Sequence, residues 1–91
     1  MNDILHLNVK AEYFDAIKSG DKVEEYRLYN DYWKKRLVDR EYRLVAIKKG
    51  YPKRNDFSRI EVRHYRGYEV KTITHPHFGS EPVEVFAIWV N

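Results

Sequence analysis

The first residues of the chain alternate between apolar and polar side chains. Residues 4–9 (ILHLNV) place Leu5 and Leu7 beside His6 and Asn8, so that apolar side chains recur at every second position. This period of two is typical of a β-strand, because successive side chains of a strand point to opposite faces. We therefore predict a first strand over these residues, and we expect it to be central in its sheet.

Helical spacing replaces this alternation over residues 10–20. Four side chains recur three or four residues apart there, namely Tyr13, Phe14, Ala16 and Ile17. Lys18 followed by Gly20 is typical of the last turn and end of a helix. A second, shorter helix is predicted over 31–38, capped by Asn30. Its side chains expected to face the core are Tyr32, Trp33 and Leu37.

Extended segments fill most of the remaining chain. They are residues 23–29, 42–50, 59–65, 68–75 and 83–90. The last of them, VEVFAIWV, is apolar on nearly both faces, which favours a central strand. Two helices before a run of strands with short connections predict an α+β fold, with the strands bent or closed into a small β-barrel. A length of 91 residues gives room for one core, so residues 1–91 are expected to form a single domain.

Composition excludes several classes of protein. The chain has no cysteine, so it has neither a disulfide framework nor a thiolate zinc site. No apolar run approaches the roughly 20 residues that span a bilayer, and the chain starts without a secretion signal, so we expect a cytoplasmic protein with no membrane partner. No cofactor motif is present. His75 and His77 have no acid or cysteine close in sequence, so no metal site is predicted.

Positive charge is concentrated in the middle of the chain. Residues 43–71 hold nine Lys or Arg against three acids, interleaved with aromatic residues. Such a segment suits RNA, which offers both phosphates and stacking faces, but it also suits a solvated face of surface strands. On the first interpretation the outer RNA contacts would be Lys49, Tyr51, Lys53, Arg54, Tyr65, Arg66, Lys71 and His75.

A second cluster of charges lies in residues 19–27 (SGDKVEEYR), at the predicted junction of helix and strand. Glu25 and Arg27 are two apart on a strand and share a face, and Lys22 at the strand entrance can join them. One interpretation is a salt-bridge cluster that ties helix to strand, since an unpaired charge out of water is costly. The other is a binding site whose donors and acceptor face a base or a phosphate.

The same residues carry a resemblance to a known family. Gly20, Lys22, Glu25 and Arg27 fit the pattern GxKxxExR, and the chain resembles the ASCH domains, small PUA-like β-barrel proteins, over nearly its whole length. The resemblance implies a cleft that faces RNA or a modified nucleoside, with Lys22, Glu25 and Arg27 as binding residues and as candidate catalytic residues. Members of this family bind RNA, cut it or hydrolyse an acylated cytidine.

These activities leave alternatives open. The related acetylcytidine amidohydrolases carry a lysine at the position of Lys22 but a threonine nucleophile at the position of Glu25, so this chain lacks that nucleophile. A ribonuclease would need a base, an acid and a cation, and Glu25, His75 or His64, and Lys22 or Arg27 have the required chemistry. The remaining alternative is a protein-interaction module that binds an acidic partner, for instance in a phage or other mobile element.

Overall fold

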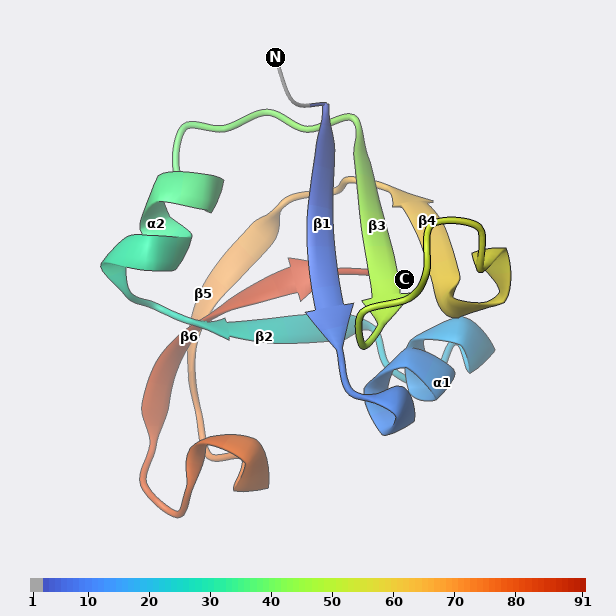
Figure 1. Cartoon of the computed structure of the whole chain (residues 1–91). Helices are drawn as coiled ribbons and strands as arrows, with labels where there is room; N and C mark the ends of the chain where they lie inside the picture. Colours follow the sequence, from blue (N-terminus) through green and yellow to red (C-terminus); the bar gives the residue numbers. More distant parts are fainter. Residues whose placement is uncertain (1–2) are drawn as a thin grey trace.

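The computed structural model describes residues 3–91, which form two α-helices, six strands and two short 3₁₀ helices (Figure 1). In chain order they are β1 (Ile4–Val9), α1 (Ala11–Ser19), β2 (Glu24–Leu28), α2 (Asp31–Leu37), β3 (Leu44–Lys49), η1 (Phe57–Arg59), β4 (Ile60–His64), β5 (Tyr68–Ile73), η2 (Pro76–Phe78) and β6 (Val83–Trp89). No helix among these residues is long and apolar enough to cross a membrane. The predicted α+β class is confirmed.

The strands form two separate sheets. The first has the order β1-β3-β4, with β1 parallel and β4 antiparallel to β3. The second has the order β2-β6-β5, and both of its pairings are antiparallel. In Figure 1, β1 and β3 run across the direction of β2. The pairings within residues 3–91 make two three-stranded sheets and no closed barrel, so the predicted closure of the strands is not found.

The hydrophobic core lies between these sheets and is completed by the helices. It is formed by side chains of β1, α1, α2, β3 and β6 and by Val90. Phe14, Phe86 and Leu7 are among the largest side chains that are fully buried. Burying an apolar side chain of this size contributes about 1.5–3 kcal/mol, so these contacts between distant segments hold the two sheets together.

The strand order corrects one prediction and confirms another. Within the described residues β1 lies at the edge of its sheet, not in the centre, and β3 is the central strand. The reason is visible in burial: β1 alternates between buried Leu5 and exposed His6, whereas β3 buries the consecutive residues 45–47. A strand covered on both faces belongs in the middle of a sheet. The last strand, β6, is central as predicted.

The helices follow the sequence pattern with one exception. Helix α1 begins after Lys10 and ends at Gly20, whose φ of 91° is in the left-handed region that favours glycine. In α2, Leu37 is buried and Trp33 packs against the core, but Tyr32 is 55% exposed. The prediction for Tyr32 was wrong, because this side chain lies on a different face of the helix from Trp33 and Leu37. Those two residues are four apart and therefore share one face. Its ring lies 3.6 Å from the Arg36 guanidinium.

Asn91 connects the C-terminal segment to the turn between α1 and β2. Its side-chain amide donates hydrogen bonds to the main-chain oxygens of Ile17 and Lys22, each at 2.8 Å. Its Oδ1 accepts a hydrogen bond from Nε of Arg63 at 3.3 Å. One amide thereby joins helix α1, the start of β2 and strand β4, and it fixes the main chain at Lys22.

We expect Asn91→Ala to lower the free energy of unfolding by roughly 1–3 kcal/mol, because the main-chain oxygen of Lys22 loses the Asn91 donor and that of Ile17 keeps only the N–H of Gly20. Urea denaturation followed by circular dichroism measures the change. Asn55→Ala is the matched control, since Asn55 is exposed in the loop after β3. Equal stability of the two variants would contradict the role given to Asn91.

Candidate functional site

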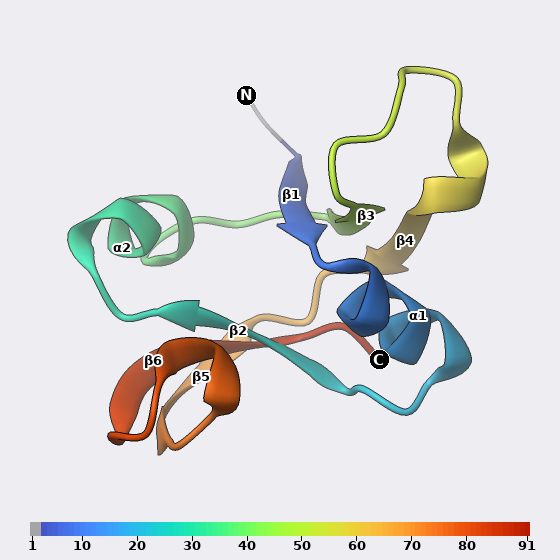
Figure 2. The same cartoon turned by 60° about the horizontal axis from the view of Figure 1, so that its bottom comes forward.

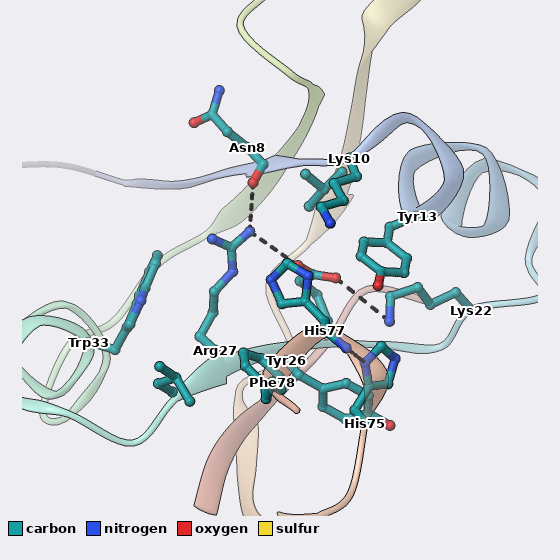
Figure 3. A pocket seen from close by; sticks show the side chains of 13 residues that line it. Asn8, Lys10, Tyr13, Lys22, Tyr26, Arg27, Trp33, His75, His77 and Phe78 are labelled. Atoms are coloured by element: carbon teal, nitrogen blue, oxygen red, sulfur yellow. Dashed lines mark hydrogen bonds and ion pairs between the residues drawn. The ribbon is translucent and has the colours of Figure 1, made fainter. Parts of the chain in front are cut away.

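A cavity of about 260 Å³ opens where the end of β1, the start of α1, β2, α2 and the η2 turn meet (Figure 3). Figure 2 shows the ribbons of these elements from a second side. Its lining comes from segments far apart in the sequence. The lining residues are Asn8, Val9, Lys10, Tyr13, Lys22, Glu25, Tyr26, Arg27, Leu28, Trp33, His75, His77 and Phe78. The cavity therefore has a charged wall, supplied largely by β2, and aromatic walls supplied by helices and the η2 turn.

Glu25 is the most deeply buried charged residue of this wall. It is 7% exposed, and its strand is paired with the central strand β6, where Glu25 lies opposite Ile88. Its Oε2 accepts a hydrogen bond from Nη2 of Arg27 at 3.1 Å, and its Oε1 lies 3.7 Å from the ammonium of Lys22. The predicted clustering of these three charges is confirmed, and the cluster faces a cavity.

Burial determines the protonation of this carboxyl. Loss of water raises the pKa of Glu25 above its usual value, although the neighbouring Arg27 and Lys22 act to lower it. The net shift of the pKa is upward because the solvation free energy that the buried carboxylate loses exceeds its favourable interaction with the two cations. Glu25 is thus closer to exchanging a proton near neutral pH than an exposed glutamate is.

Arg27 is held from several sides. Its Nη2 donates to the main-chain oxygen of Asn8 at 2.8 Å as well as to Glu25. Its guanidinium lies 5.0 Å from the ring centre of Trp33, within the range of a cation–π contact. Its Nε is buried without a hydrogen-bond partner. A strand, a helix and the end of β1 therefore fix one face of this guanidinium.

Lys22 lies between two tyrosine rings. Its ammonium is 5.1 Å from the ring centre of Tyr13 and 4.8 Å from that of Tyr26. The backbone N–H of Lys22 donates to the oxygen of Ala16, which sets the tight turn after α1. These contacts hold the ammonium at the charged wall.

The η2 turn closes the cavity on the side opposite β1. Its histidines contact Tyr13 edge-on, with ring centres 6.0 Å apart for both His75 and His77, and Figure 3 shows both rings beside Lys22 and Tyr13. Partial loss of solvent, together with the neighbouring Lys10, His75 and Arg27, lowers the pKa of His77. No group of three His, Cys, Asp or Glu side chains within residues 3–91 is placed to hold a metal ion.

The structure brings together four of the predicted site residues and leaves the others elsewhere. Lys22, Glu25, Arg27 and His75 line the cavity. The residues that do not line it are Lys49, Tyr51, Lys53, Arg54, Tyr65, Arg66 and Lys71. Three of these have other partners: Lys49 pairs with Asp15, Lys71 pairs with Glu24 and Glu69, and Tyr65 packs beside Tyr42.

The loop after β3 remains open to solvent. Tyr51 is 91% exposed, and Lys53 and Arg54 are exposed beside it. Its main chain is connected to the cavity through Asn8, whose side-chain amide donates to the oxygen of Gly50 at 2.7 Å. This loop is a surface separate from the cavity lining.

Sequence reasoning did not identify Lys10, Tyr13, Trp33 and His77 as cavity residues. Tyr13 and Trp33 have the spacing of core side chains, and both do pack against the core. Their second role depends on the approach of Lys22 to the ring of Tyr13 and of Arg27 to the ring of Trp33, which no local pattern reveals. The proximity of His75 and His77 in sequence was a usable signal, because a site that contains one of them brings the other close.

No family model, curated protein or solved structure matches the chain significantly.

We expect the free energy of unfolding of the wild-type protein to fall, relative to Glu25→Gln, as pH rises from 4.5 through the raised pKa of Glu25. In that window the folded state binds more protons than the unfolded chain, so raising the pH favours unfolding. Urea denaturation of both proteins between about pH 4 and 8 measures the difference. Glu81→Gln, at an exposed position, should follow the wild-type profile. Parallel profiles for wild type and Glu25→Gln would contradict the raised pKa.

Proposed function

We propose that this chain is an ASCH domain with a PUA-like fold, and that it binds a nucleobase of RNA or of a free modified nucleoside in the cavity. The observation that carries the proposal is the buried Glu25 carboxylate, held between Lys22 and Arg27 at the wall of a cavity with aromatic sides. These three charges are the lysine, glutamate and arginine of the GxKxxExR pattern.

The size and lining of the cavity favour a base. Pockets for drug-sized ligands enclose about 300–1,000 Å³, so a cavity of about 260 Å³ suits a smaller, flat group. The rings of Tyr13, Tyr26 and Trp33 offer faces or edges to such a group, and stacking on aromatic side chains is a sequence-tolerant way to hold a base. These features together suit a planar heterocycle better than a peptide or a lipid chain.

The charged wall supplies the polar contacts that a base requires. Lys22 and Arg27 donate hydrogen bonds, as a base carbonyl needs, and Glu25 accepts, as the amino group of cytosine needs. Because the Arg27 guanidinium is already fixed by Asn8 and Trp33, little conformational entropy would be lost when a ligand binds.

The outer contacts belong to the exposed part of the basic segment. Tyr51, Lys53, Arg54 and Arg66 are exposed, and they are our candidates for contacts to RNA outside the cavity. Lys49, Lys71 and Tyr65 would first have to leave the partners described above, so we expect smaller contributions from them.

We expect Arg27→Gln to weaken binding of RNA or nucleoside by about 10- to 100-fold, the loss of one charge-assisted hydrogen bond. A change in tryptophan fluorescence reports occupancy in a titration at low salt, because Trp33, one of the two tryptophans of the chain, lies beside Arg27. Arg43→Gln is the matched control, because Arg43 is exposed and outside the cavity.

An Arg27→Gln protein that stays folded and binds as tightly as wild type would place the ligand elsewhere. Binding that persists in this variant but falls when Lys53 and Arg54 are neutralised would instead indicate a surface that binds an acidic partner.

The second candidate function is cleavage of RNA by internal transesterification, and the observation that favours it is the raised pKa of Glu25 in a cavity that also holds His75 and Lys22. In this reaction the 2′-oxygen attacks phosphorus while Glu25 accepts its proton. The bond from phosphorus to the 5′-oxygen breaks, His75 donates a proton to that oxygen, and Lys22 stabilises the charge on the phosphorane. The products are a 2′,3′-cyclic phosphate and a free 5′-hydroxyl.

We expect mass spectrometry of RNA and modified nucleosides incubated with the purified protein to decide between binder and enzyme. If the protein is an enzyme, new products accumulate, and the Glu25→Gln and Lys22→Met variants lose at least about 100-fold in rate, within the range that acid–base catalysis contributes. Glu81→Gln should retain the wild-type rate. Retained ligand without product would exclude catalysis on the molecules tested.

A further inference from the structure

The cavity lining holds more positive than negative charge. Lys10, Lys22 and Arg27 line it, and Glu25 is the one acid among its lining residues. Glu12, in the first turn of α1, acts on the pKa of Tyr13 and His77 from nearby but does not line the cavity. Even with Glu12 counted, cations exceed acids, so the site has an uncompensated positive charge that a neutral nucleoside would not balance.

Hydrogen-bond donors also exceed acceptors at the charged wall. An ammonium has three N–H groups, and the acid nearest to that of Lys22 is the Glu25 oxygen 3.7 Å away. Arg27 uses Nη2 for two acceptors, Asn8 and Glu25, while within residues 3–91 its Nη1 has no recorded acceptor. The ligand is therefore expected to bring several acceptor atoms to the site.

The positions of the cations separate a deep part of the site from its rim. Lys10 is exposed, whereas Glu25 is buried and Lys22 and Arg27 are largely covered, with side chains 15% and 19% exposed. Figure 3 shows Lys10, Lys22 and Arg27 around the pocket, with Trp33 on one side and Tyr13 on the other. A planar group between the aromatic walls would thus have a cation at its outer end.

We propose that the ligand is a phosphorylated nucleoside, with its base toward Glu25 and its phosphate at the rim, bound by Lys10 and by the free N–H groups of Lys22 and Arg27. This inference rests on the proposed function and specifies the class of ligand. A phosphate brings both the negative charge and the acceptor oxygens that the lining lacks. The same chemistry is present in a free nucleotide and in the phosphorylated end of an RNA chain.

The test is calorimetric titration of the purified chain, at low salt, with the four ribonucleosides, their 5′-monophosphates and inorganic phosphate. At least one monophosphate should bind ten times or more tightly than its nucleoside and more tightly than inorganic phosphate. Lys10→Gln should remove most of that difference. Lys18→Gln is the matched control, since Lys18 is exposed at the far end of α1.

Each other result has a defined meaning. Equal affinity for nucleoside and monophosphate overturns this inference and leaves the proposed function standing. Inorganic phosphate that binds as tightly as the monophosphates overturns base recognition, and thus the proposed function. If no small ligand binds, short RNAs with a 5′-phosphate or a 5′-hydroxyl are compared: preference for the phosphate supports an RNA end as the source, and equal or absent binding overturns the inference.

Discussion

A buried carboxylate costs solvation free energy unless cations lie close to it. This constraint applies at Glu25 and determines how the candidate site is arranged. Lys22 and Arg27 must stay close to it, and they are in turn fixed by Asn8, by tyrosine rings and by Trp33. Loss of one cation would leave a buried charge that the fold cannot solvate. The positions of the end of β1, the start of β2 and helix α2 are thereby coupled through one ionic group.

The two sheets give this group its rigidity. Strand β2 is paired with the central strand β6, whose consecutive residues 85–88 are all buried, so the strand that carries Glu25 and Arg27 is supported by a fully buried segment. At the C-terminal end of the chain, the side-chain amide of Asn91 donates a hydrogen bond to the main-chain oxygen of Lys22 and so fixes the turn before β2. Catalytic and binding groups need such support because a site is only as well defined as the elements beneath it.

Much of this architecture could be predicted from local patterns. Periodicity identified both helices, the apolar character of both faces predicted the central position of β6, and strand parity placed Glu25 and Arg27 on one face. The division of the strands into two separate sheets and the edge position of β1 could not be predicted, because strand order depends on long-range pairing rather than on any single segment. The same reason applies to the cavity: Trp33 and Tyr13 have core-like spacing, and only the tertiary fold brings cations to their rings.

The residues that line the cavity come from two kinds of segment. Its three central charges lie within residues 22–27, on one short segment, whereas His75, His77 and Phe78 come from a turn between β5 and β6 that contributes no residue to the hydrophobic core. Changes in that turn could alter the shape of the cavity without disturbing the ion pairs. Residues 75–78 are therefore the part of the cavity lining where substitution costs the fold least, since they belong neither to the core nor to the ion pairs.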